Sequence, residues 1–274
     1  MSGVTEVVAH RGSSADVPEH TLAAYVQAVA DGADSLECDV RLTADGHLVC
    51  VHDRRIDRTS DGRGVVSVMT LEDLHRRDFG RWREAPGAGR PGTARSDLEE
   101  PFVIDEDRRR VLTLERLLEL VVDSEREIGL AIETKHPTRY GPLVEESTVA
   151  LLRRFGLARP RSERDSRVRI MSFSQLSMRR VRVLAPGLPT VFLMDRVPLR
   201  FRDGSLPFGS EIAGPSVEIV RAHPRYVERV HRAGGRVHVW TVDQPADVEL
   251  CARLGVEAII TNRPGPVLAQ LGRS

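Results

Sequence analysis

Residues 35–53, SLECDVRLTADGHLVCVHD, contain two short apolar runs that carry acidic side chains and are joined by a turn. Side chains alternate between the faces of a strand, so Glu37 and Asp39 share one face of the first run. Their backbones are then ~6.6 Å apart, which lets both carboxylates reach one cation at ligand distances of ~2.0–2.6 Å. Asp45-Gly46 is a hairpin turn signal, so the second run should bring His52 toward the same pocket. A surface hairpin is the alternative, but these acids lie among apolar residues, where an unpaired charge is costly.

The residues before this stretch predict a strand–helix–strand unit. Residues 4–9 form an apolar run that ends in His10-Arg11-Gly12, typical of a buried strand that delivers polar side chains at its carboxyl end. A histidine that only packs in the core is the commoner case, but the adjoining arginine favours a functional role for His10. We expect a helix from Pro18 to about Ala30. Two strands joined by a helix indicate a parallel sheet.

The alternation of strand and helix continues to the end of the chain. Apolar runs predict further strands at about residues 129–135, 168–172, 189–194, 211–214, 236–241 and 257–261. Eight main strands in a chain of 274 residues predict a (β/α)8 TIM barrel. A doubly wound sheet is the alternative, but no G-x-G-x-x-G turn follows the first strand.

We expect residues 1–274 to form a single domain with an insertion at about residues 54–111, after the second barrel strand. Within it, Thr70 should cap a short helix over residues 71–77. Residues 81–101 are rich in Gly, Pro, Ala and Arg and predict an irregular, mobile loop.

Composition excludes several classes of protein. The formal net charge is zero, with 40 basic and 40 acidic residues, so neither a nucleic-acid partner nor a polybasic membrane anchor is expected. We find no apolar run of the ~20 residues that a membrane span needs, and no signal peptide. Cys38, Cys50 and Cys251 lack metal-site spacing and should be free thiols, which fits the cytoplasm. The oligomeric state is not indicated.

The unusual polar residues all follow predicted barrel strands at their carboxyl ends, which converge on one mouth in a TIM barrel. They are His10, Arg11, Glu37, Asp39, His52, Glu133 and Lys135. Three carboxylates without a cysteine cluster suit one hard divalent cation, Mg²⁺ or Ca²⁺. The remaining groups are two cations and two histidines.

These remaining groups indicate phosphoester chemistry. An ion together with Arg11 and Lys135 suits an anion that bears phosphate. The histidines supply a general acid and a general base. Lys135 is the only lysine, in a chain whose other basic residues are all arginine, which hints at a site that needs a compact charge. The sequence therefore predicts cleavage of a phosphoester.

The ordered set H-R-G, P-E-x-T, E-x-D-V, T-x-D-G, V-x-H-D, E-x-K, S-F, W-T-V and I-T-N-x-P resembles the glycerophosphodiester phosphodiesterase family from residue 7 to residue 264. The resemblance implies a TIM barrel that releases sn-glycerol 3-phosphate and an alcohol through a cyclic phosphate. It implies His10 and His52 as acid and base, Glu37, Asp39 and Glu133 as metal ligands, and Arg11 and Lys135 as phosphate-binding residues. We further expect Phe173 and Trp240 to line the substrate pocket.

One departure from the family pattern and two alternative functions stay open. His20 stands where the family usually has asparagine, which puts the preference for the leaving alcohol in doubt. A lysophospholipase D is one alternative, because the loop over residues 195–209 could shelter a lipid tail. A non-catalytic protein that binds a phosphodiester is the other, although both histidines are present. The partner expected in every case is a small phosphodiester.

Overall fold

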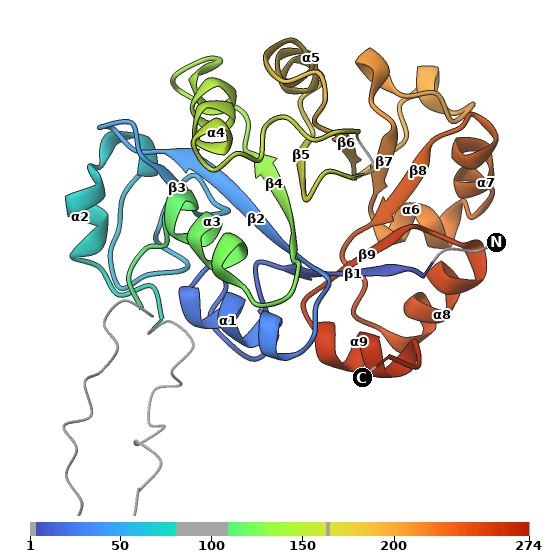
Figure 1. Ribbon diagram of the computed structural model, residues 1–274, viewed down its shortest axis with the longest axis horizontal. Helices are drawn as coiled ribbons and strands as arrows, with labels where there is room; N and C mark the ends of the chain where they lie inside the picture. Colours follow the sequence, from blue (N-terminus) through green and yellow to red (C-terminus); the bar gives the residue numbers. More distant parts are fainter. Residues whose placement is uncertain (1–3, 81–108, 163–164, 274) are drawn as a thin grey trace, which may run out of the picture.

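The computed structural model describes residues 4–80, 109–162 and 165–273. Eight parallel strands form a closed barrel with helices around it, and β1 completes the ring by pairing with both β9 and β2 (Figure 1). The barrel strands are β1 (Glu6–His10), β2 (Ser35–Leu42), β4 (Gly129–Thr134), β5 (Val168–Ser172), β6 (Thr190–Met194), β7 (Ile212–Pro215), β8 (Arg236–Val239) and β9 (Ala258–Thr261). The predicted TIM barrel is confirmed.

The short strand β3 (Leu48–Cys50) lies antiparallel to β2, outside the ring of parallel strands. Its register pairs Leu42 with Leu48 and Val40 with Cys50, so the chain runs back from the end of β2 toward Asp39. The turn uses Gly46 at φ +86°, a left-handed conformation that glycine adopts without steric cost. The predicted hairpin therefore forms, and it carries the chain toward His52 at the barrel mouth.

Helices surround the barrel, and polar side chains cap several of them at the predicted positions. The helices are α1 (Leu22–Ala30), α2 (Leu71–His75), α3 (Leu114–Asp123), α4 (Leu143–Arg154), α5 (Gln175–Leu184), α6 (Val217–Ala222), α7 (Arg225–Arg232), α8 (Pro245–Leu254) and α9 (Pro264–Gln270). Thr70 and Asp73 form a reciprocal capping box at α2, and Ser174 caps α5. Gly255 ends α8 in the left-handed conformation.

Buried apolar side chains form a layer inside the barrel, a layer between barrel and helices, and a separate cluster around β3 and α2 that includes Val49, Ile56 and Leu74. The inner layer is small and includes Val8, Ala131, Met171 and Ile260. Each strand alternates its side chains between the two faces of the barrel, so it contributes to both layers. The outer layer is larger because the helices add their buried side chains to it. No helix in the described parts of the chain is long and apolar enough to cross a membrane.

The elements differ from the sequence predictions at the start of α1 and at α6. Helix α1 begins at Leu22 with Thr21 as its cap, later than the expected start at Pro18, because His20 adopts φ +59° outside the helical region. Helix α6 was not predicted. The expected mobile loop at 81–101 lies outside the described residues, as does much of the predicted insertion at 54–111.

Gly12 should tolerate no side chain, because it follows β1 directly and its backbone packs against Ala24 of α1. It has φ +84°, and a Cβ there would lie 2.5 Å from the carbonyl carbon of Ala24. Gly46 is a matched control, since it has φ +86° and no described atom within 4 Å of an added Cβ. Gly46→Ala should cost about 1–2 kcal/mol of unfolding free energy from backbone strain alone. Gly12→Ala should cost clearly more in urea unfolding, and equal losses would contradict this account.

Candidate active site

Strands β2 and β4 hold three buried carboxylates at the carboxyl end of the barrel. Glu37 and Asp39 share one face of β2, and the β2–β4 register places Asp39 beside Glu133. Each residue offers one carboxylate oxygen, and these oxygens lie within 4.8 Å of one another. Carboxylate oxygens are the ligands that Mg²⁺ and Ca²⁺ prefer, so the three residues could hold one such ion.

The electrostatics of the three acids also suit a cation. Burial and the neighbouring Asp39 carboxylate raise the pKa of Glu37 well above its usual range. The same two causes raise the pKa of Glu133 to about 8, although Lys135 opposes the shift. Burial would raise the pKa of Asp39 as well, but Arg11, His20 and Lys135 hold it well below its usual value. The site therefore favours the charged form of Asp39 and disfavours the charged forms of Glu37 and Glu133, a preference that a divalent cation would reverse.

Two positive side chains flank the acids. Lys135 Nζ lies 2.8 Å from Glu133 Oε1 and 3.3 Å from Asp39 Oδ1. Arg11 Nε lies 3.0 Å from Asp39 Oδ2 without hydrogen-bond alignment, so this contact is an ion pair only. The backbone N–H of Arg11 donates to Glu37 Oε2 at 3.1 Å. Both cations therefore lie against the proposed metal ligands and could also bind a phosphate oxygen.

His10 is held in one tautomer by the amide of Asn262. The Asn262 amide nitrogen donates to Asp243 Oδ2 at 2.6 Å, which orients the amide oxygen toward His10. That oxygen lies 2.8 Å from His10 Nδ1 and also accepts from the Ser14 hydroxyl. His10 Nδ1 must then carry the proton, which leaves Nε2 as a free acceptor. Burial and the charge of Arg11 lower the pKa of His10 to about 3.

His52 has a carboxylate as its partner. Its Nδ1 lies 2.7 Å from Asp53 Oδ1, so Nδ1 donates and Nε2 is free. Arg41 fixes the backbone here, because its Nε and Nη2 donate to the His52 carbonyl at 3.0 and 2.8 Å. Burial lowers the pKa of His52, although Asp39 opposes the shift. The pKa of each of the two histidines therefore lies below that of an ordinary histidine.

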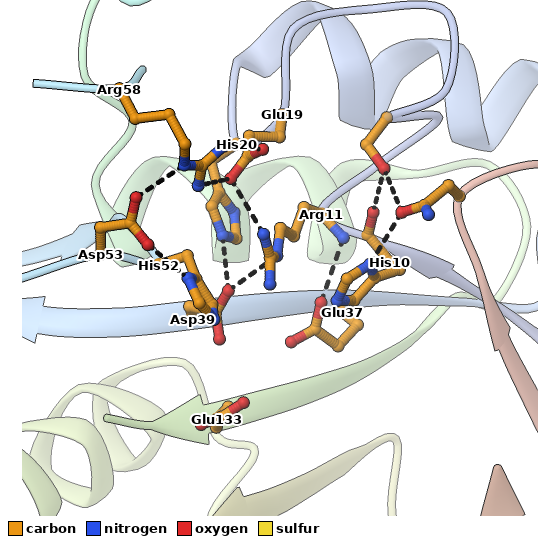
Figure 2. Close-up of polar contacts among 12 residues, drawn as sticks. His10, Arg11, Glu19, His20, Glu37, Asp39, His52, Asp53, Arg58 and Glu133 are labelled. Carbon is orange, nitrogen blue, oxygen red and sulfur yellow. Dashed lines mark hydrogen bonds and ion pairs between the residues drawn. The ribbon is translucent and has the colours of Figure 1, made fainter. Parts of the chain in front are cut away.

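A chain of ion pairs connects His52 with the acids (Figure 2). Arg58 Nε donates to Asp53 Oδ2 at 2.6 Å, and its two terminal nitrogens donate to the Glu19 carboxylate at 2.7 and 2.8 Å. Glu19 Oε1 also accepts from Arg11 Nη1 at 3.0 Å, and Arg11 in turn pairs with Asp39. This chain ties the loop after β1 to the loop after β3, so it positions groups on both sides of the site.

His20 lies behind the acids and not at the mouth of the barrel. It is buried, its Nε2 lies 2.9 Å from Asp39 Oδ2, and its Nδ1 lies 2.8 Å from the Tyr25 hydroxyl. Any effect of histidine at this position should therefore act through Asp39. Whether it bears on the leaving alcohol stays a prediction, since His20 is not among the residues that line the cavity beside the acids.

A cavity of about 200 Å³ opens beside these groups. Its wall includes eight of the nine predicted site residues: His10, Arg11, Glu37, His52, Glu133, Lys135, Phe173 and Trp240. The ninth, Asp39, lies directly behind the wall. The rings of Phe173 and Trp240 meet edge to face at 5.4 Å, and Trp240 Nε1 donates to the Gly214 carbonyl. The structure thus brings all nine residues together, and their roles stay predictions.

Several residues of the site could not be assigned a position from the sequence. Asp53 directly follows His52, and strand alternation would point the two side chains apart. They meet because β3 ends at Cys50 and the chain bends before residue 52. Glu19, Arg58 and Asn262 lie in loops, where no periodicity predicts direction. The only signal in the sequence was the family motifs: Glu19 belongs to P-E-x-T, Asp53 to V-x-H-D and Asn262 to I-T-N-x-P.

Comparisons with known proteins agree on one family. A profile of the Glycerophosphoryl diester phosphodiesterase family matches residues 10–266. A Mycobacterium tuberculosis protein named "Probable glycerophosphodiester phosphodiesterase 1" is 45% identical over 271 residues, which cover 99% of this chain and 94% of the relative. The glycerophosphodiester phosphodiesterase of Caldanaerobacter subterraneus is 33% identical over 268 residues, 95% of either chain.

Solved structures show the same architecture. The glycerophosphodiester phosphodiesterase of Agrobacterium tumefaciens superposes with a TM-score of 0.71 at 26% identity and covers 97% of this chain and 99% of its own. An Oleispira antarctica phosphodiesterase, in complex with the product sn-glycerol-3-phosphate, superposes with a TM-score of 0.79. It covers 98% of this chain and 97% of its own at 21% identity, a likeness of fold.

Cation binding should depend on pH in a defined direction. Because the pKa of Glu133 is raised to about 8, this carboxyl holds a proton at neutral pH that a bound ion must displace. Affinity for Mg²⁺ or Ca²⁺ should therefore rise from about pH 6 to about pH 8, with release of protons. Calorimetric titration in two buffers of different ionisation enthalpy measures both effects. Binding that is independent of pH and buffer would contradict the assigned ligand set.

Proposed function

The chain belongs to the glycerophosphoryl diester phosphodiesterase family, and from this premise we propose that it hydrolyses glycerophosphodiesters with one bound divalent cation and two catalytic histidines. One arrangement carries the proposal. The acids, the two cations and both histidines lie around one small cavity, with each imidazole tautomer set by a different partner. The products would be sn-glycerol 3-phosphate and an alcohol. Mg²⁺ and Ca²⁺ both suit the ligands, and a cytoplasmic location stays a prediction.

His10 is suited to act as the general base of the first step. Its Nε2 lone pair is free, and its partner Asn262 is neutral, which does not favour a charged imidazole in the resting state. In this step Nε2 takes the proton of the glycerol 2-hydroxyl as that oxygen forms its bond to phosphorus. Proton removal at this stage typically contributes about 10²–10⁴-fold in rate.

His52 is suited to act as the general acid of the same step. The Asp53 carboxylate on its Nδ1 stabilises a positive imidazolium, as a neutral amide could not. Binding of an anionic diester also favours the proton that the free site disfavours. As the bond from phosphorus to the alcohol oxygen breaks, Nε2 gives its proton to that oxygen. In-line displacement needs the base and the acid on opposite sides of phosphorus.

The second step reverses the two roles. His52, now neutral, takes a proton from a water molecule as the water oxygen attacks phosphorus of the cyclic phosphate. The bond from phosphorus to the glycerol 2-oxygen breaks, and His10 returns its proton to that oxygen. Arg11 and Lys135 are placed to hold the phosphoryl oxygens throughout. A bound divalent cation would supply Lewis-acid stabilisation of negative charge on those oxygens. Phe173 and Trp240 would cover the carbon face of the glycerol unit.

The aromatic side chains of the loop over residues 195–209 do not form a cover for a lipid tail. Phe201 of this loop is buried, and its ring packs against Phe192 at 5.7 Å. Phe192 belongs to the layer between barrel and helices, so Phe201 points away from the mouth. Phe208 is exposed. These contacts favour a water-soluble diester over a lysophospholipid.

Product release tests the proposed function. The purified protein should release sn-glycerol 3-phosphate from glycerophosphocholine in an enzyme-coupled assay with added Mg²⁺ or Ca²⁺. Exhaustive chelation should remove this activity and lower the melting temperature, because an ion that binds the native state stabilises it. Lysophosphatidylcholine should be a poorer substrate. Full activity after chelation would overturn the metal requirement, and no product from any glycerophosphodiester would overturn the function.

Substitution of the two histidines tests the mechanism. His10→Ala and His52→Ala should each reduce turnover by about 10²–10⁴-fold. The double variant should lose less than the product of the two losses, because the residues act as a unit. All three variants should retain cation binding by calorimetry. His47→Ala is the control, since this histidine is exposed in the β2–β3 turn. Near-normal turnover in either single variant refutes the two-histidine mechanism.

A further inference from the structure

A second pocket, of about 240 Å³, lies next to the active site and shares Lys135 with it. Three further basic side chains line this pocket: Arg41, Arg54 and Arg139. Among its described lining residues there is no aspartate or glutamate. A hollow with four cationic side chains and no acid stands out in a chain whose formal net charge is zero, and it would attract an anion.

The pocket lies on the side of His52. Arg41 lies two residues beyond Asp39 on the same face of β2, and its guanidinium holds the His52 carbonyl. Arg54 follows Asp53 directly in the chain, one residue further from His52. In the proposed reaction His52 protonates the departing oxygen. A pocket beside His52 is therefore placed to receive the alcohol that this oxygen belongs to.

The sizes of the two pockets suit a substrate whose two halves occupy different pockets. Pockets for small molecules typically measure ~300–1,000 Å³. The catalytic cavity of about 200 Å³ and the basic pocket of about 240 Å³ each fall below that range, whereas together they fall within it. A glycerol phosphate unit in the first and an alcohol in the second would use both.

In the described parts of the chain, two of the four positive side chains of the pocket have no carboxylate partner, whereas Lys135 pairs with Asp39 and Glu133. Within the described residues, neither Arg54 nor Arg139 has a carboxylate at ion-pair distance. Burial lowers the pKa of Arg41, the carboxylates of Asp39, Glu133 and Asp53 oppose that shift, and the charge of Arg54 adds to it. Arg41 and Arg54 therefore repel one another. An anion between them would relieve the repulsion and gain charge-assisted hydrogen bonds.

The wall of the pocket is held together by contacts within the protein. The Tyr140 hydroxyl donates to the Ser67 carbonyl at 2.6 Å, which joins the loop after β4 to the 3-10 turn η1 (Val66–Val68). The Arg139 guanidinium lies 5.8 Å from the centre of the Tyr140 ring. Both loops that contribute arginines are thus fixed before a ligand arrives, which lowers the entropic cost of binding.

We propose that this pocket is a subsite for a leaving alcohol that carries its own negative charge, such as a phosphorylated polyol, so that the preferred substrates are glycerophosphodiesters of anionic alcohols. This inference rests on the proposed function and specifies its substrate class. Lys135 would contact the scissile phosphate from one pocket while Arg54 and Arg139 contact the second anionic group in the other.

A matched pair of substrates tests the subsite. Glycerophosphoinositol and its 4-phosphate differ by one phosphate group, and kcat/KM is measured for both by release of sn-glycerol 3-phosphate. The wild-type protein should prefer the 4-phosphate by about tenfold or more, as expected for one or two hydrogen bonds between charged groups. Arg54→Ala combined with Arg139→Ala should remove most of this preference. Both side chains are exposed, so the double variant should fold.

Arg55→Ala is the control. This arginine is exposed, adjoins Arg54 in sequence, and pairs with Asp57 at 3.1 Å outside the pocket. It should keep the wild-type preference. Equal use of both substrates by the wild type, preference for the unphosphorylated one, or a preference that survives in the double variant would overturn the subsite while the proposed function stands. No glycerol 3-phosphate from either substrate, nor from glycerophosphocholine, would overturn the function and this inference with it.

Discussion

The ionised carboxylate of Asp39 is the constraint on which the rest of the site depends. A buried charge of this kind is unstable without partners, and Asp39 has three: Arg11, His20 and Lys135. Through Arg11 it is linked to Glu19 in the loop after β1, and through Lys135 to Glu133 on β4. Burial and the same charge raise the pKa of Glu37 and Glu133, so the site disfavours a second and a third ionised acid beside Asp39. One charged side chain therefore contacts both Arg11 and Lys135 and shifts the pKa of the other two acids.

The fold explains why these groups meet at all. Parallel strands place their carboxyl ends at one mouth, so residues from β1, β2 and β4 converge although β1 and β4 are more than a hundred positions apart in sequence. His52 comes from no barrel strand, and the β2–β3 hairpin brings the chain back along β2 toward Asp39. The hairpin thus adds one functional group to a ring that would otherwise lack it.

Much of this could be predicted from the sequence, because it depends on periodicity. Alternation along strands placed Glu37 with Asp39 and Glu133 with Lys135, and the turn signal at Asp45-Gly46 located the hairpin. The contacts of Glu19 and Arg58 could not be predicted, because side chains in loops follow no repeat. The pKa of His10 could not be predicted either, since it depends on burial and on the charge of Arg11 in the folded protein. Local pattern predicts which residues reach the mouth, and only three-dimensional contacts show how each is charged.

Lys135 gives this site an unusual spectroscopic property. It is the only lysine of the chain, and its ammonium group lies 2.8 Å from Glu133 Oε1 in the centre of the site. Isotopically labelled lysine, supplied during expression, would therefore produce a single side-chain ammonium resonance, with no assignment problem and no chemical modification. Its chemical shift would report the protonation of Glu133 and the presence of a cation or phosphate beside it. A barrel of this size would then reveal the state of its active site through one nuclear magnetic resonance signal.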